Sequence, residues 1–408
     1  MQIKLNLVDF IRSTFQETTD FIPLHVPLFI GNEKKYMAEC IDSNFVSSVG
    51  EFVVRFEQKC AEYTGAKYAV AAMNGTSALH IALLLSGVKR DDEVITQALT
   101  FIATANAISY IGAKPVFIDV DKETMGLSPQ KMEAWLQENV ELREVTPHPL
   151  SPSDPLPVSP SPTLSLSPFN NTTGRSISAC VPMHTFGHPV KLTELQAVCE
   201  RYNIPLIEDA AESIGSHYKG KHTGTFGKIG ILSFNGNKLI TTGGGGMILT
   251  DDQHLAKMAR HLTTQAKVPH PYELLHDCIG YNYRMTNISA ALGVAQMESL
   301  DYLLRLKRTL AERYNEFFRN TEYEFFTEPV DCKSNYWLNV LITKDKAHRD
   351  ELLQFTNQHG IMSRPIWELM NRLSMFADCQ TDGLENSMWF AERVVNIPSS
   401  AIIAGYRK

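Results

Sequence analysis

The sequence predicts an α/β protein with a large amino-terminal domain, built on a mostly parallel central sheet, and a smaller carboxyl-terminal α+β domain. Short apolar runs alternate with helical patterns between residues 67 and 211. The runs are followed by polar residues, as strands are at the carboxyl edge of a parallel sheet. A long charged run at residues 301–320 then changes the character of the chain. We therefore expect one domain over residues 1–300 and a second over 301–408.

Composition excludes several classes of protein. The 408 residues are 44% hydrophobic and 20% charged, which is typical of a soluble globular protein. The net charge of −7, with no basic block, argues against a nucleic-acid partner. Because Asp9 and Arg12 interrupt the first apolar residues and no run reaches about 18 apolar residues, we expect no signal peptide and no membrane partner. Seven scattered cysteines suggest neither disulfides nor a metal site, so we expect a cytoplasmic protein.

The elements are expected in the following order. Residues 1–35 are mixed and contain Pro23 and Pro27, which favours an extended lead-in. Residues 32–63 have helical spacing on both sides of a break at 47–50, so two helices are expected there. The expected strands of the large domain are residues 67–73, 92–97, 114–120, 178–184 and 205–211.

Helices are expected between these strands, in ALHIALLLSG, in FIATANAISYIG with Thr100 as its cap, and at residues 191–203. Further helices are expected at DQHLAKMARHL and ISAALGVAQMESL, with a loop at 280–286 between them. A long charged helix at 301–320 and a strand at 336–342 begin the smaller domain.

Residues 143–176 interrupt the alternation and are rich in proline and serine. Proline lacks the amide that a strand ladder needs, and the segment has little apolar bulk for a core. We interpret it as a flexible surface insertion without a catalytic role. A proline-rich docking segment is the alternative.

The stretch ILSFNGNKLITTGGGGMILT (231–250) places Lys238 in a short loop between two apolar runs. A lysine that faces inward on such a loop is desolvated, which favours the free amine that attacks a carbonyl. The glycines allow backbone to approach a bound ligand closely. The alternative is a surface hairpin with a solvated lysine.

Several residues that follow the predicted strands could surround this amine. Gly75 and Thr76 open a helix, where free amides and the helix dipole favour a phosphate, and Ser233 adds a hydroxyl. Asp209 follows an apolar run, and a half-buried carboxylate there needs a cation, such as a protonated pyridine nitrogen. Phe101 offers a face for stacking. For these positions a plain capped helix and an ordinary core phenylalanine are the alternatives. A phosphate, a pyridinium, a stacking face and a reactive lysine together describe pyridoxal 5′-phosphate.

Five motifs in register carry a family resemblance. They are NGTSAL (74–79), HTFGHP (184–189), EDAAES (208–213), SFNGNK (233–238) with its glycines, and GYNYR (280–284). The chain resembles the DegT/DnrJ/EryC1/StrS sugar aminotransferases from about residue 23 to residue 398. This resemblance implies the fold type I, aspartate aminotransferase-like fold of pyridoxal-phosphate enzymes. The SFNGNK and MHTFGHP segments are most similar to the branch that aminates C4 of UDP-linked 4-keto-6-deoxy-N-acetylhexosamines, on routes to bacillosamine and legionaminic acid.

The resemblance implies roles for the cofactor-binding residues. Lys238 would hold the cofactor covalently and then move a proton, and Asp209 would hold the pyridine nitrogen. Phe101 would stack on the ring, Glu212 would contact its hydroxyl, and Gly75, Thr76 and Ser233 would surround the phosphate. Glu212 stands where many relatives have glutamine.

Other roles concern substrates and a second subunit. Asn282 would reach the cofactor phosphate of a partner subunit, so the resemblance implies a homodimer with shared active sites. The candidates for substrate contacts are His184, Arg284 and Arg364; for Arg364 the alternative is a surface arginine. L-glutamate would donate the amino group to a nucleotide sugar.

Two other functions fit parts of the pattern. A regulator of the same fold would bind pyridoxal phosphate without transamination. A nucleotide-binding protein could use the glycine run, but this run lacks the GxxxxGK[ST] spacing and precedes a strand. A related group of sugar dehydratases replaces the lysine with histidine, and Lys238 argues against that reaction.

Overall fold

The computed structural model describes residues 2–145 and 165–403. Its centre is a sheet in the order β3-β2-β6-β7-β10-β11-β1, in which parallel bridges between Cys180 and Leu206 and between Met183 and Asp209 join a three-stranded to a four-stranded portion. The strands are β1 (Tyr68–Ala72), β2 (Glu93–Gln97), β3 (Lys114–Ile118), β6 (Ile177–Val181), β7 (Ile207–Asp209), β10 (Ile229–Ser233) and β11 (Gly246–Thr250).

Only β11 runs antiparallel to its neighbours in this sheet; the remaining pairs between the described strands are parallel. The mostly parallel sheet and the fold type I architecture are therefore confirmed. Because β1, β2, β7 and β10 point the same way, the residues that follow them meet at one edge of the sheet.

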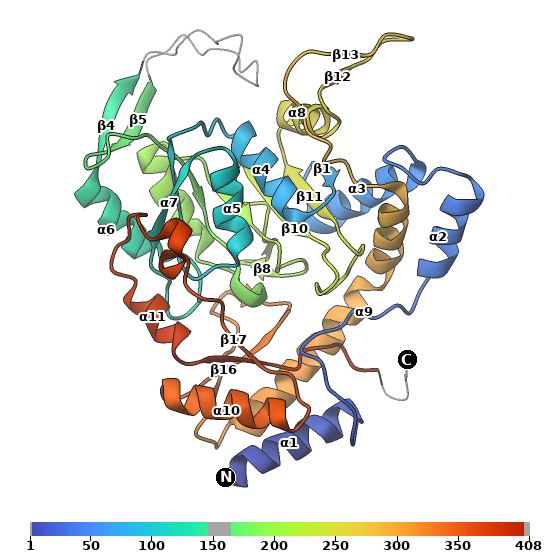
Figure 1. Ribbon diagram of the computed structural model, residues 1–408, viewed down its shortest axis with the longest axis vertical. Coiled ribbons are helices and arrows are strands. Elements are labelled where there is room, and N and C mark those ends of the chain that lie inside the picture. The colour runs from blue at the N-terminus through green and yellow to red at the C-terminus, as the bar shows by residue number, and fades with distance from the viewer. Residues whose placement is uncertain (1, 146–164, 404–408) are drawn as a thin grey trace.

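Helices cover both faces of the sheet (Figure 1). One face carries α4 (Gly75–Leu85), α5 (Ile102–Tyr110) and α8 (Gln253–Thr263). The other carries α3 (Glu51–Thr64), α6 (Pro129–Asn139), α7 (Leu192–Tyr202) and the first half of α9 (Asn287–Phe318). Side chains along a strand alternate between the two faces of the sheet. Val94 therefore packs on the face covered by α4, α5 and α8, and Ile95 packs on the face covered by α6 and α7.

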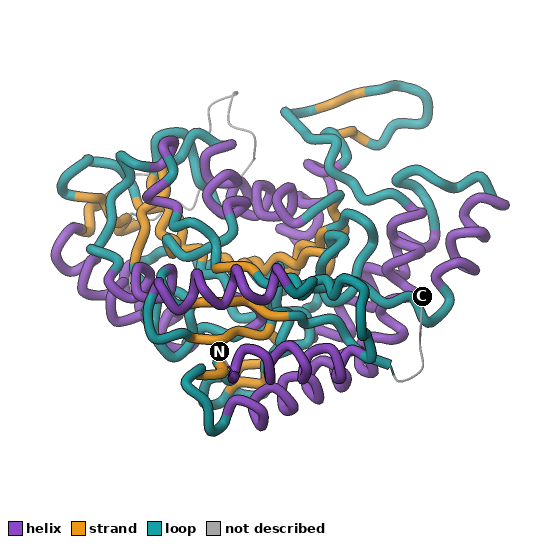
Figure 2. The backbone as a smooth tube through the Cα atoms, turned by 60° about the horizontal axis from the view of Figure 1, so that its bottom comes forward, coloured by secondary structure: helices purple, strands orange, loops and turns teal. Residues whose placement is uncertain are grey.

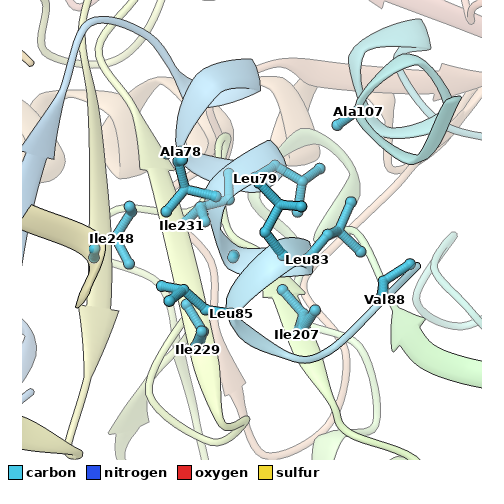
Figure 3. Close-up of a cluster of buried hydrophobic side chains, with 14 of the residues drawn as sticks. Ala78, Leu79, Leu83, Leu85, Val88, Ala107, Ile207, Ile229, Ile231 and Ile248 are labelled. Carbon is cyan, nitrogen blue, oxygen red and sulfur yellow. The ribbon is translucent and has the colours of Figure 1, made fainter. Parts of the chain in front are cut away.

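Helix α4 lies in the middle of this packing. Its residues Leu79, Leu83 and Leu85 pack against Ile229 and Ile231 of β10 and their neighbours (Figure 3). A helix that is apolar on nearly all sides is stable only when it is buried. Its burial fixes the position of its amino terminus at the edge of the sheet.

A second, antiparallel sheet lies in the carboxyl-terminal part of the chain, in the order β14-β16-β18-β17. Helices α1 (Gln2–Phe15) and α10 (Lys346–Gln358) and the second half of α9 form its core with it, and they lie together at the bottom of Figure 1. The strands are β14 (Glu324–Phe325), β16 (Asn339–Ile342), β17 (Arg364–Pro365) and β18 (Val394–Ile397).

The remaining elements are short or peripheral, and the hairpin of β12 and β13 projects away from the body (Figure 2). The helices are α2 (Glu33–Asp42), α11 (Glu385–Ala391) and the 3-10 turns Thr185–Gly187, Met370–Arg372 and Ser374–Phe376. The strands are β4 (Val140–Val145), β5 (Ser165–Asn170), β8 (His217–Tyr218), β9 (Lys221–His222), β12 (Lys267–Val268), β13 (Leu275–His276) and β15 (Cys332–Lys333).

Two expectations about the first 110 residues were wrong. Residues 2–15 form α1, because Leu7, Val8 and Ile11 share one face and pack against the end of α9. Thr100 does not cap α5: the cap residue is Phe101, and the Thr100 hydroxyl bonds instead with that of Thr104, 3.0 Å away.

The insertion also differs from its prediction. Residues 140–145 and 165–170 form an antiparallel ladder, in which Pro168 lies opposite Leu142. A ribbon of two strands tolerates proline where the missing amide would face away from the partner. The alternative interpretation, a proline-rich docking segment, concerns mainly residues 146–164, which lie outside the described residues.

The domain boundary near residue 300 stays a prediction. Helix α9 runs through this position without a break, and α1 packs with the carboxyl-terminal elements. The seven cysteines, all within the described ranges, are free thiols. No helix in the part of the chain that the structure describes is both long and apolar enough to cross a membrane.

Candidate active site

A cavity of about 290 Å³ opens at the carboxyl edge of the central sheet. Its walls come from the segments after β1, β2, β7 and β10 and from two tryptophans of the carboxyl-terminal part, Trp337 and Trp367. Seven residues predicted from the sequence line this one cavity: Gly75, Thr76, Phe101, Asp209, Glu212, Ser233 and Lys238.

Lys238 faces into the cavity and not into solvent. Its side chain is only 11% exposed, which excludes the alternative of a solvated surface hairpin. The ammonium nitrogen Nζ lies 3.1 Å from Oε1 of Glu212 and 3.9 Å from the ring centroid of Trp337. The loop that carries it is fixed by the Lys238 amide, which donates to the carbonyl of Asn235. The arrangement presents a single amine beside a carboxylate.

The start of α4 forms one end of the cavity. Asn74 caps this helix, since its Oδ1 accepts a hydrogen bond from the Ser77 amide at 2.7 Å. The amides of Gly75 and Thr76 come before the first intrahelical donors and remain available to an anion. Gly75 also lies against Ser233, because a Cβ atom added there would be 2.9 Å from the Cβ of Ser233. The capped helix and the anion site are therefore compatible.

Asp209 is the last residue of β7 and is almost completely buried. Its Oδ2 accepts a hydrogen bond from the Thr104 hydroxyl at 2.7 Å, and its Oδ1 accepts one from the Ala211 amide at 3.2 Å. Burial raises the pKa of the Asp209 carboxyl despite these bonds. A cation at this position, such as a protonated ring nitrogen, would therefore stabilise the charged carboxylate.

Glu212 is the second buried carboxyl group of the cavity. Its Oε2 accepts a hydrogen bond from the Phe186 amide at 2.9 Å, while Oε1 faces Lys238. Burial raises the pKa of Glu212 to about 7, although the charge of Lys238 opposes this shift. Close to neutral pH this group therefore exchanges a proton readily.

Phe101 is not an ordinary core residue, because 48% of its side chain is exposed at the cavity. Its ring meets that of Trp367 edge-on, with centroids 6.1 Å apart. Trp367 in turn packs on Phe186 at 4.8 Å. The exposed face of Phe101 can stack with a flat ring in the cavity.

His184 does not reach the cavity, which argues against the predicted substrate contact. The ring is fully buried, and its Nδ1 accepts a hydrogen bond from the Val190 amide at 3.2 Å. The other nitrogen, Nε2, lies 3.2 Å from Oε2 of Glu208 and can donate to it. Both ring nitrogens are thus used by the fold, and His184 orders the backbone behind Asp209, whose carbonyl accepts from the His184 amide.

The other three predicted residues also lie outside the cavity of their own chain. Arg284 forms an ion pair with Oε1 of Glu57 at 2.6 Å, and it donates to the Ala71 carbonyl. Its substrate contact stays a prediction. Asn282 and Arg364 are exposed.

The sequence analysis missed several cavity residues, among them Thr104 and Trp337. Thr104 lies in the first turn of α5, four residues after Thr100, the expected cap. Only its spacing from Phe101 could have indicated that it faces the cavity. Trp337 comes from a segment about one hundred residues after Lys238 and was assigned only to a strand. Trp337 contacts the lysine directly.

Four features of the site fit pyridoxal phosphate: amides and a hydroxyl where Gly75 packs on Ser233, the buried carboxyl group of Asp209, the exposed ring face of Phe101 and the buried amine of Lys238. The fold and the site define a pyridoxal-phosphate-dependent aminotransferase. The sequence profile of the DegT/DnrJ/EryC1/StrS aminotransferase family matches residues 29–143 and 164–405. The chain belongs to this family.

Its relatives agree with this assignment. GDP-perosamine synthase of Escherichia coli O157:H7 is 37% identical over 358 residues, which cover 88% of each chain. EpsN of Bacillus subtilis (strain 168), provisionally named as a pyridoxal phosphate-dependent aminotransferase, is 36% identical over 87% of this chain and 84% of its own. The solved structure of Helicobacter pylori PseC superposes with a TM-score of 0.79 at 20% identity, over 93% of this chain and 94% of that one, which shows the shared fold.

Proposed function

We propose that this sugar aminotransferase moves an amino group from L-glutamate to C4 of a nucleotide-linked 4-keto-6-deoxy sugar, UDP-2-acetamido-2,6-dideoxy-hexos-4-ulose, for bacterial surface-glycan biosynthesis. The observation that carries the proposal is the buried amine of Lys238, which faces the cavity beside two buried carboxyl groups. The SFNGNK and MHTFGHP segments support the UDP-linked substrate. Relatives named GDP-perosamine synthase support a nucleotide-linked sugar of another kind.

Different residues of the cavity would bind different parts of pyridoxal phosphate. The amides of Gly75 and Thr76 and the Ser233 hydroxyl would bind its phosphate, and Phe101 would stack on its ring. Asp209 would keep the ring nitrogen protonated. When bound, the cofactor supplies an electron sink and a carrier for the amino group.

Lys238 and Glu212 are the residues proposed to transfer the proton at the substrate carbon. Lys238 would hold the cofactor, and its amine would move a proton at the substrate carbon. Glu212 lies within hydrogen-bond distance of Nζ, so it holds the proton that this amine gives up. Its pKa of about 7 suits such an exchange near neutral pH.

We also propose a cytoplasmic homodimer in which the active sites are shared. Asn282 is exposed and lies outside the cavity of its own chain, which leaves it free to reach the cofactor phosphate of a second subunit. The cavity lining includes no arginine, so Arg364 would approach the substrate only after a movement of its segment.

An assay of amino transfer tests the substrate. The purified protein is incubated with glutamate and a panel of UDP-, GDP- and dTDP-linked 4-keto-6-deoxy sugars, and the amino-sugar products are identified by mass spectrometry and NMR. We expect the UDP-linked N-acetyl sugar to give the highest kcat/KM and an amine at C4. Preference for the GDP-linked sugar would contradict the proposed substrate. We expect the yellow colour of the holoenzyme to be lost when glutamate is added. A bound cofactor that does not respond to glutamate would support the alternative function, a regulator that binds pyridoxal phosphate without transamination.

A further inference from the structure

We infer that Trp337, which the carboxyl-terminal part of the chain contributes, is a positioning residue that holds the amine of Lys238 toward Glu212. The indole face lies over Nζ at 3.9 Å from the ring centroid, and Oε1 of Glu212 lies at 3.1 Å. A cation is attracted to the face of an indole ring, and most strongly where water is excluded. Trp337 and Glu212 thus define where the amine sits. The inference rests on the proposed role of Lys238.

The orientation of the indole is fixed by the lysine loop itself. Its Nε1–H donates to the carbonyl of Asn237 at 2.8 Å, and Asn237 immediately precedes Lys238. The Trp337 amide donates to Oδ1 of Asn335 at 2.8 Å. Because the ring is held at its edge and at its backbone, it cannot turn away from Nζ without breaking a hydrogen bond.

The same short segment also holds the loop of Glu212. The side-chain amide of Asn335 donates to the carbonyls of Glu212 and Ile214, each at 2.9 Å. Gly187 makes room for this side chain, since a Cβ atom there would lie 1.8 Å from Oδ1 of Asn335. Both neighbours of the amine are therefore tied to one buried segment that begins at Asn335.

A buried lysine, Lys307, donates a hydrogen bond to the backbone of this segment. Lys307 on α9 is fully buried, and its Nζ donates to the carbonyl of Trp337 at 2.8 Å and also to that of Ser399. This hydrogen bond connects α9 with the segment that carries Trp337. The position of Trp337 beside the active-site amine is therefore fixed by a buried residue of the long helix.

Two effects distinguish positioning from simple packing. When the indole is removed, the amine no longer faces the cofactor in one orientation, so attachment is slower even at saturating pyridoxal phosphate. The concentration of pyridoxal phosphate that gives half-maximal attachment stays unchanged, because the residues that would bind its phosphate, Gly75, Thr76 and Ser233, are intact. A substitution that merely disturbed the packing of the cavity would change both quantities.

The experiment measures pyridoxal phosphate attachment to the cofactor-free protein, by absorbance and by borohydride trapping, over a range of cofactor concentrations. We compare the wild type with Trp337→Leu and Trp337→Phe, and we use Trp389→Leu as the matched control. The ring of Trp389 also faces cations, with Lys122 and Arg393 at 5.1 Å and 4.9 Å from its centroid, but Trp389 does not line the cavity. Circular dichroism and urea unfolding report on the fold.

We expect Trp337→Leu to attach the cofactor roughly tenfold more slowly at saturating pyridoxal phosphate, with an unchanged half-saturating concentration. Trp337→Phe keeps an aromatic face and loses the hydrogen bond to Asn237, so its maximal rate falls by less. Trp389→Leu should match the wild type in both.

Either of two results would overturn the inference: unchanged kinetics in Trp337→Leu, or an equal effect in Trp389→Leu. If Trp337→Leu does not fold, Trp337→Phe decides, and an unchanged maximal rate in it refutes the inference. Trapping at a residue other than Lys238 in the wild type would refute the proposed role of the lysine instead.

Discussion

The two carboxyl groups of the cavity make stability depend on pH, and Glu212→Gln isolates the larger part of this dependence. Burial raises the pKa of Glu212 from 4.5 to about 7 in the folded protein. Between these values the folded chain binds a proton that the unfolded chain has lost. Stability therefore rises as the pH falls through about 7, and the full penalty remains above it. The difference corresponds to about 3 kcal/mol, or about 1.4 kcal/mol per pH unit.

The assay is urea unfolding of the cofactor-free protein at intervals from pH 4.5 to pH 8. Glutamine cannot titrate, so the free energy of unfolding of the wild type should fall by about 3 kcal/mol relative to Glu212→Gln over this range. Glu62→Gln, at an exposed position on α3, should follow the wild type. If the difference between wild type and Glu212→Gln does not vary with pH, or grows as the pH falls, our account of Glu212 is refuted.

Three other experiments test the site. Asp209→Asn keeps the size of the side chain and removes its charge, so turnover should fall about 100-fold or more with an unchanged circular dichroism spectrum; near-normal turnover would exclude its role. Gly75→Ala brings a methyl group to 2.9 Å from the Cβ of Ser233 and should weaken pyridoxal phosphate binding roughly tenfold in a fluorescence titration, whereas unchanged affinity would contradict the anion site. A mixture of Lys238→Ala and Asn282→Ala chains should regain activity above both parents through one intact shared site, and no recovery would count against the shared-site dimer.

The central sheet could be predicted because its strands are short, apolar and separated by helical patterns. Local sequence does not determine which strands pair, so the antiparallel β11 and the neighbours of β1 needed the structure. The continuity of α9 was missed for a different reason. The composition changes near residue 300, but no proline or glycine breaks the helix there.

The cavity residues that follow strands were predictable, because parallel strands bring their carboxyl ends to one edge. Asp209 and Lys238 are examples of this rule. His184 also follows a strand, yet its ring turns away and bonds with Glu208, which the order of residues does not reveal. Trp337 reaches the site through tertiary packing alone, so no local pattern marks it.

The most direct test of our account is to locate the covalent bond between the protein and its cofactor. The yellow holoenzyme is reduced with borohydride and digested, and the peptide that carries the pyridoxyl group is sequenced by mass spectrometry. We predict a single modified residue, Lys238, and no modification in Lys238→Ala. A pyridoxyl group on any other lysine, or none at all, would contradict the account.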